Sequence, residues 1–286
     1  MLGSSVSSLV LALALAAPFP QASSSSSPAL DQQPTNPNSG NTTALVPQQL
    51  RKAQPPPANA SADQLEAMGD SLRSENLFAD SLDYYRAAMR KTDSAVLHDK
   101  AGIADLSLAH LQEARKEFER AVHIDKHYAE AYNNIGVIAY FQKKWSRANK
   151  FYRKAIELRE PFASFHANYG AALFAEKDYD KAFKEYSRAL RLDPEIFDHT
   201  NRAGVVMRPA SITDRAHYDY VIAKIYASQG NSDRCLLYLR KSLEEGYSQI
   251  GDVYKDNAFD RIRKDPRFVS LMSQRPAAIP ETNPNQ

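Results

Sequence analysis

The sequence lacks most of the features by which enzymes and nucleic-acid-binding proteins are recognised. No G-x-S-x-G motif, Walker motif or dinucleotide fingerprint occurs in its 286 residues. Basic and acidic residues number 36 and 34, which leaves a formal charge of +2 and no positive excess for nucleic acid. The single cysteine, Cys235, excludes an internal disulfide. These absences favour a fold that packing alone stabilises.

Long apolar segments are missing as well. Residues 9–17 form an uninterrupted apolar run, and nine residues are too few to cross a membrane, which takes about 20. Small residues and a serine-rich stretch follow the run, which resembles the core of a secretory signal peptide, although no Lys or Arg precedes Arg51. We therefore predict a signal peptide over residues 1–22 and a periplasmic or extracellular location. The alternative is a disordered tail on a cytoplasmic protein.

Two segments have a composition typical of disorder. Residues 23–61 are rich in Ser, Pro, Gln and Asn and contain three charged residues, so they bury too little apolar surface to offset the entropy of ordering. Residues 274–286 have a similar composition. We predict a flexible linker in the first segment and a disordered tail in the second.

Four of the ten glycines recur at a nearly constant spacing. Gly69, Gly102, Gly136 and Gly170 stand 33, 34 and 34 residues apart. Each is followed by a small residue 12 positions later, an aromatic 16 positions later and an alanine 19 positions later. In order along the chain these residues are Ser81, Tyr85 and Ala88; Ala114, Phe118 and Ala121; Ala148, Tyr152 and Ala155; and Ala182, Tyr186 and Ala189.

The pattern describes helices that cross closely and share an apolar stripe. A small residue is needed where two helix axes approach, and the aromatic and the alanine fall on one helix face. A period near 34 with Gly, Ala, aromatic and Ala in this order resembles the tetratricopeptide repeat (TPR) family, whose unit is two antiparallel helices joined by a turn. The resemblance implies an all-α solenoid, because one unit cannot bury its own stripe.

Five repeat units follow from this register. Residues 62–194 carry four repeats, and an insertion at 195–215 separates them from a divergent fifth at 216–247. In the fifth unit Ala223 replaces the glycine, Cys235 the small residue and Leu239 the aromatic. The last unit of a repeat array must cover an exposed apolar stripe, so we predict that residues 248–273 form a cap with a final helix.

The charged residues alternate in sign along the expected second helices, as in EARKEFERA and RANKFYRKAIELRE. Opposite charges three or four residues apart pair on a helix surface. The alternation therefore predicts a solvated outer surface whose charges neutralise one another.

Two histidines stand at a spacing that suits a metal ion, since one helix face can carry both His123 and His127. Two ligands are fewer than zinc sites use, and no HExxH motif completes them, so solvated histidines are the simpler interpretation. Cys235 takes a packing position, which favours an inert thiol over a nucleophile. We predict no enzyme activity, metal or cofactor.

The family resemblance also implies where a partner would bind, because the first helix of each repeat lines a concave groove in that family. Glu66 and Asp70 stand where some members hold a terminal carboxylate with Lys and Asn, and two acidic side chains would repel one. The resemblance therefore implies an acidic entrance followed by an apolar middle. The candidate protein-binding residues are Glu66, Asp70, Asn133, Val137, Tyr140, Phe141 and Phe174. The alternative is that the aromatic residues are core, covered by the insertion or by neighbouring helices.

From the sequence we expect a non-enzymatic scaffold or adaptor that binds a peptide or protein segment in this groove, with neither nucleic acid nor a membrane span involved. An alternative from another class is a structural spacer in a cell-envelope or secretion assembly. An enzyme or metal carrier using the histidines is a third possibility, disfavoured by the missing ligand sets.

Overall fold

A computed structural model describes residues 53–197 and 211–274 of the chain. The predicted signal peptide lies outside the described residues, as do most of the predicted linker, the middle of the insertion and the tail after Gln274. The described residues fold as helices, with no strand among them. The hairpins are α1 (Ala62–Ser74) with α2 (Phe78–Met89), α3 (Ala95–Ser107) with α4 (Leu111–Ile124), α5 (Ala129–Phe141) with α6 (Trp145–Leu158), α7 (Ala163–Ala175) with α8 (Tyr179–Leu192), and α9 (Ile212–Ser228) with α10 (Ser232–Glu244).

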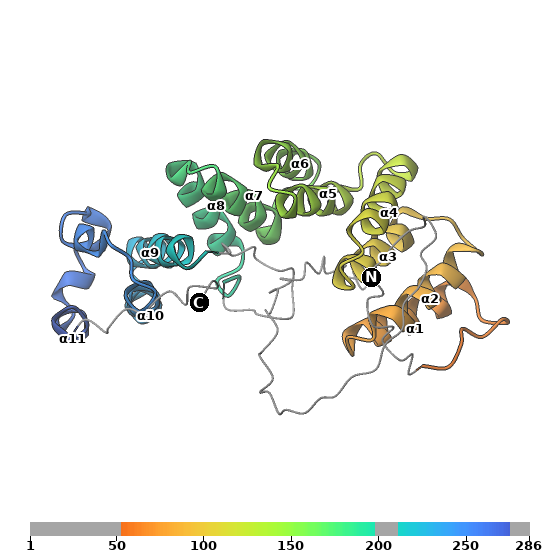
Figure 1. Cartoon of the computed structure of the whole chain (residues 1–286), viewed down its shortest axis with the longest axis horizontal. Coiled ribbons are helices and arrows are strands. Elements are labelled where there is room, and N and C mark those ends of the chain that lie inside the picture. Colours follow the sequence, from red (N-terminus) through yellow and green to blue (C-terminus); the bar gives the residue numbers. More distant parts are fainter. Residues whose placement is uncertain (1–52, 198–210, 275–286) are drawn as a thin grey trace, which may run out of the picture.

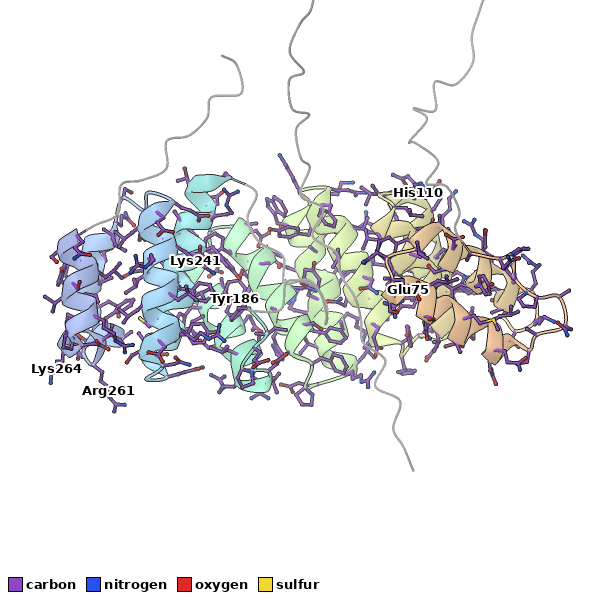
Figure 2. All side chains as sticks on the ribbon, turned by 90° about the horizontal axis from the view of Figure 1, so that it is seen from below. Glu75, His110, Tyr186, Lys241, Arg261 and Lys264 are labelled. Atoms are coloured by element: carbon purple, nitrogen blue, oxygen red, sulfur yellow. The ribbon has the colours of Figure 1, made fainter. Side chains whose placement is uncertain are left out.

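Successive hairpins stack side by side into an arch, which Figure 1 shows from α1 at one end to α11 (Pro266–Gln274) at the other. Three short 3-10 helices, η1 (Ile250–Tyr254), η2 (Asn257–Phe259) and η3 (Ile262–Lys264), connect the fifth hairpin to α11. In Figure 2 Tyr186 lies among the helices, whereas Arg261 and Lys264 project from the far end. The all-α solenoid of five hairpins with a final helix is confirmed.

Each hairpin turns at the same place in the repeat. Five residues, each seven positions after the repeat glycine or its equivalent, have a positive φ: Asn76, Ala109, Lys143, Lys177 and Gly230. The next residue donates its backbone N–H to a carbonyl five residues earlier, as Leu77 does to Leu72 at 2.9 Å. This left-handed cap satisfies carbonyl groups at the end of the first helix. The fifth unit therefore keeps the same turn. It has glycine at the position with positive φ, and glycine adopts that conformation most easily.

The repeat glycines are required by the aromatic ring of their own hairpin. A Cβ on Gly136 would lie 2.6 Å from Cε1 of Tyr152, and one on Gly170 would lie 2.7 Å from Cδ1 of Tyr186. We expected the small residue 12 positions after the glycine to mark the point where the two helices cross. In the structure the aromatic ring 16 positions after the glycine fills that space. In the fifth unit the larger Ala223 faces a helix in which the smaller Leu239 replaces the ring, and both are fully buried.

The substitution Gly136→Ala should therefore destabilise the protein by about 1–3 kcal/mol, because an overpacked core must shift side chains or backbone. In an unpacked helix the same change would stabilise by about 1 kcal/mol. Urea unfolding followed by circular dichroism measures the difference. In a Tyr152→Leu background, which copies the Ala and Leu pair of the fifth unit, the penalty for Gly136→Ala should vanish. A stabilised Gly136→Ala single variant would contradict this account.

The last part of the predicted linker, residues 53–60, packs against the first hairpin. The Ala53 N–H donates to Oδ1 of Asp80 at 3.0 Å, and the Tyr84 hydroxyl donates to the Gln54 carbonyl at 2.9 Å. Both partners are on α2. Three consecutive prolines at 55–57 have no N–H groups to satisfy, and their rings restrict the backbone. A small number of contacts is therefore enough to order this segment. Residues 53–60 thus cover the front of the array.

The beginning of the predicted insertion also packs against the hairpins. The Ile196 side chain is buried, and the Tyr238 hydroxyl of α10 donates to the Phe197 carbonyl at 3.1 Å. The chain therefore remains attached to the array for several residues beyond α8.

Candidate inner-face site

The first helices of neighbouring hairpins are joined by a polar contact that recurs along the array. A residue three positions before the repeat glycine bonds to the residue two positions before the glycine of the next repeat. The pairs are Glu66 with Lys100 at 2.6 Å, Asp99 with Asn134 at 2.8 Å, and Asn133 with Asn168 at 3.1 Å. The fourth repeat has Ala167 in the first of these positions, so the row ends at Asn168. We call this row the polar ladder.

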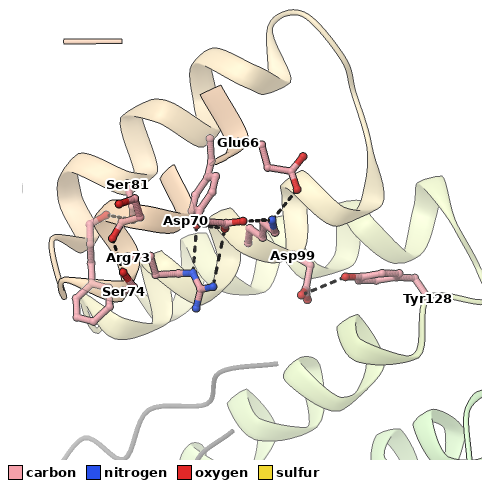
Figure 3. A network of polar contacts seen from close by, with 11 residues as sticks. Glu66, Asp70, Arg73, Ser74, Ser81, Asp99 and Tyr128 are labelled. Carbon is pink, nitrogen blue, oxygen red and sulfur yellow. Dashed lines mark hydrogen bonds and ion pairs between the residues drawn. The ribbon is translucent and has the colours of Figure 1, made fainter. Parts of the chain in front are cut away.

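At the front of the ladder, five residues form what we call the front cluster: Glu66, Asp70, Arg73, Tyr85 and Lys100. The Lys100 ammonium donates to Oε1 of Glu66 at 2.6 Å and to Oδ2 of Asp70 at 2.5 Å. The Tyr85 hydroxyl donates to the other Asp70 oxygen at 2.8 Å and accepts from Arg73 Nε at 3.1 Å. Figure 3 shows these contacts converging on Asp70.

The predicted acidic entrance is therefore neutralised. Glu66 and Asp70 lie beside two cations, and the side chains of the two acids are still 28% and 37% exposed. Burial, together with the nearby Asp70 charge, raises the pKa of Tyr85, so its hydroxyl stays protonated and donates. The cluster presents fixed donors and acceptors and little net charge. Lys100 was not among the site residues predicted from the sequence, although it follows Glu66 by 34 residues, which is one full repeat.

Asp99 is the buried acid of the ladder. Its side chain is 1% exposed, and Oδ1 accepts from Asn134 at 2.8 Å while the Tyr128 hydroxyl lies 3.5 Å from Oδ2. Burial raises the pKa of Asp99 to about 7, because the two hydrogen bonds only partly offset the loss of water and Glu130 adds a like charge nearby. Glu130 is itself buried and pairs with Arg159. Asp99 therefore carries a proton for much of the time near neutral pH.

Most of the predicted apolar middle of the groove is buried in the structure. Val137 and Asn133 are fully buried, and Phe174 is 3% exposed. The Phe174 ring packs against Tyr179, His217 and Tyr218, with centroids 5.1, 5.3 and 6.1 Å away. The alternative, that neighbouring helices cover these residues, therefore describes Phe174 correctly. Phe174 is core because His217 and Tyr218 of α9 pack against its ring.

Two aromatic candidates remain closer to the surface. Tyr140 is 9% exposed and packs on Trp145, with ring centroids 4.9 Å apart. Phe141 is partly exposed and meets Tyr140 edge to face at 6.4 Å. Of the four apolar candidates, Phe141 is the one that a partner can reach without unfolding the array.

The other candidate chemistry does not assemble into a site. His123 and His127 are both exposed, and the described part of the chain holds no group of three His, Cys, Asp or Glu placed to bind a metal. Burial raises the pKa of the Cys235 thiol to about 12, with Asp265 adding to the shift. A thiol that stays protonated is a poor nucleophile.

A pocket of about 680 Å³ lies at the opposite end of the array, between α10 and α11. Its lining includes Leu236, Leu237, Arg240 and Leu271. None of the candidate binding residues lines it.

Stacked hairpins joined by a repeated inner contact define a helical-repeat scaffold. Sequence models of the tetratricopeptide repeat match residues 129–162 and 163–196, which are the third and fourth hairpins. The glycine and aromatic pairs of the first two hairpins repeat the same packing. The chain is a tetratricopeptide repeat protein.

Solved structures resemble this chain at low sequence identity. PilF of Pseudomonas aeruginosa is 15% identical, with 74% of this chain and 97% of that chain aligned and a TM-score of 0.50. A TPR protein of Thermus thermophilus is 17% identical over 74% of this chain and 100% of its own, with a TM-score of 0.47. The TPR protein YrrB is 19% identical over 68% and 92%, with a TM-score of 0.43. No curated protein matches the sequence.

Tetratricopeptide repeats are typical of non-enzymatic scaffolds with protein or peptide partners. Among the described residues, no helix combines the length and the apolar character that crossing a membrane requires.

Proposed function

We propose that this protein is a non-enzymatic scaffold that binds a segment of another protein on the inner side of its first two hairpins. The observation that supports this most is the state of Asp70. Its carboxylate is held by Lys100 and Tyr85 and is still 37% exposed. A group that is already fixed loses little conformational entropy when a partner binds, so its hydrogen bonds contribute more fully to affinity.

The front cluster also indicates what kind of segment would fit. Asp70 accepts hydrogen bonds, and the neighbouring Arg73 guanidinium, 3.9 Å away, donates them. A donor and an acceptor side by side suit the polar backbone of an extended segment. Because Lys100 and Arg73 offset the two acids, a strongly basic flank in the partner is not required. Phe141 offers a separate apolar contact.

The full chain carrying Asp70→Asn should lose roughly tenfold or more in affinity for its partner, the effect of weakening a charge-assisted hydrogen bond worth about 1.5–3 kcal/mol. Affinity capture from an envelope extract, quantified by mass spectrometry, identifies proteins that depend on Asp70. The matched control is Asp63→Asn, the same change in the first turn of the same helix. If both variants and the wild type capture the same proteins in equal amounts, the inner face of the first hairpins is not the binding surface.

We also propose that the protein is exported. The support is the apolar run at residues 9–17 followed by small residues, which lies outside the described part of the chain. The mass of the mature protein in an envelope fraction tests this, since an unprocessed amino terminus there would argue against a cleaved signal peptide.

A further inference from the structure

We infer that the outer face of α6 is a second interaction surface, which binds an acidic segment of another protein. Residues 143–154 contain six basic residues and no acidic residue. All six side chains are exposed, and α6 lies on the outer side of the arch in Figure 1. We call these six residues the basic stripe: Lys143, Lys144, Arg147, Lys150, Arg153 and Lys154.

The basic stripe occurs in one repeat only. The equivalent segment of the second repeat, residues 109–120, has three basic and three acidic residues. That of the fourth repeat, residues 177–188, has four basic and three acidic residues. The excess of positive charge is therefore confined to one outer helix, between two neighbours whose charges nearly balance.

The charges of the stripe also lack the partners that the sequence led us to expect. Among the described residues, no carboxylate forms an ion pair with Arg147, Lys150 or Arg153, and Lys154 reaches Glu157 at 3.5 Å. On α8, by contrast, basic residues at equivalent positions are paired. Lys181 binds Asp178 at 2.5 Å, and Arg188 binds Glu160 at 3.1 Å. The predicted neutral outer surface is thus wrong for α6.

The stripe lowers the stability of the helix that carries it. The positive end of a helix dipole favours acidic residues in the first turn. The second helices of the other four hairpins have one there, Asp80, Glu113, Asp180 or Asp233, but α6 has none and its N-cap, Lys144, makes no side-chain cap. Lys150 and Lys154 add a like-charge pair four residues apart. Arg147 lies over the Phe151 ring at 5.7 Å and Lys144 donates to Gln142 at 3.0 Å, but neither contact pairs a positive charge with a carboxylate. A sequence that departs from local stability in this way indicates a functional surface.

The shape of the stripe favours a polypeptide as the occupant. Twelve residues at 1.5 Å per residue span about 17 Å along a single helix. A membrane or a nucleic-acid duplex would touch several outer helices, and α4 and α8 do not extend the charge. A single acidic strand or helix is long enough to cover the stripe. The undescribed segments of this chain contain only three acidic residues, Asp31, Asp198 and Glu281, so the acidic segment belongs to another molecule.

The test compares two triple variants of the full chain that lose the same charge at equivalent repeat positions. One is Arg147→Gln, Lys150→Gln and Lys154→Gln on α6, and the other is Lys181→Gln, Lys184→Gln and Arg188→Gln on α8. The probe is a fluorescein-labelled 12-residue peptide rich in Asp and Glu, followed by anisotropy at low salt. Three exposed ion pairs of about 0.5 kcal/mol each predict a loss of roughly tenfold for the α6 variant and about twofold or less for the α8 variant.

Binding should also weaken as salt is added. Equal losses in both variants would show a general response to charge and overturn the proposal. Binding of the wild type to anionic phospholipid vesicles or to duplex DNA, but not to the peptide, would overturn it as well. Circular dichroism confirms that the variants fold, and the single change Lys150→Glu replaces the triple variant if one does not. Asp70→Asn should leave peptide binding unchanged, so this proposal and the inner-face proposal fail separately.

Discussion

Replacement of Phe174 by Asp is expected to unfold the array rather than to weaken partner binding alone. The side chain is 3% exposed and packs against three rings contributed by α8 and α9. The variant loses these contacts and buries a carboxylate without a partner. Together the two effects should cost about 4–5 kcal/mol or more, which is a large part of the stability of a typical domain. Helicity by circular dichroism and the urea midpoint measure the loss.

Phe141→Asp is the matched control, because it makes the same chemical change in the preceding repeat at a partly exposed position. It should cost no more than about 1–2 kcal/mol, since an exposed carboxylate keeps its water. The two residues thus separate core from surface. A Phe174→Asp variant that keeps the wild-type helicity and midpoint but loses partner capture would support the apolar binding groove predicted from the sequence.

The fold could be predicted from the sequence because its main constraint is local. A glycine and a ring 16 residues apart lie in one hairpin, so the same steric requirement recurs at each repeat and shows as a period. The turn seven residues after the glycine recurs in the same way, and Gly230 marks it even in the divergent fifth unit. Short-range geometry of this kind is visible in one chain without any knowledge of how the hairpins stack.

The site could be predicted only in part, because its properties depend on contacts between hairpins. Phe141 and Phe174 occupy similar places in the repeat pattern, and their different exposure depends on what the next hairpin lays over them. For Phe174 that is His217 and Tyr218, which the predicted insertion separates from it in sequence. Glu66 and Asp70 predicted an acidic entrance to the groove. Lys100, which binds both and offsets their charge, comes from the following repeat.

The polar ladder itself has a sequence signal that was available. Glu66 with Lys100 and Asp99 with Asn134 are 34 and 35 residues apart. A search for polar residues that pair at one repeat length would have found both. It would not have found the burial of Asp99, since Glu66 holds the equivalent place in the first repeat and is 28% exposed.

The substitution Asp99→Asn is expected to stabilise the protein, and the gain should grow with pH. An aspartate has a pKa of 3.8 when unperturbed, and burial raises that of Asp99 to about 7 in the folded protein. Below pH 3.8 the carboxyl group is protonated in both states, and its contribution to folding is fully present. As pH rises to about 7, the unfolded chain gives up the proton while the folded protein retains it, so stability falls progressively. Above pH 7 the folded protein holds a buried charge.

A difference of about three pKa units corresponds to roughly 4 kcal/mol, and at 1% exposure solvent does little to reduce it. Asn keeps the acceptor for Asn134 and avoids the charge, and the third repeat already has Asn133 in this position. The free energy of unfolding by urea should therefore be up to about 4 kcal/mol higher for Asp99→Asn at pH 8 and nearly unchanged at pH 4.

Glu66→Gln is the control for Asp99→Asn, because Glu66 holds the equivalent position in the first repeat but is partly exposed and paired with Lys100. Removing its charge should destabilise the protein slightly, by about 1 kcal/mol or less, since only an exposed ion pair is lost. The opposite signs of the two changes follow from burial and from the Lys100 partner, as both replace a carboxylate with its amide at one position of the repeat. If the advantage of Asp99→Asn were as large at pH 4 as at pH 8, the buried charge would not be its cause.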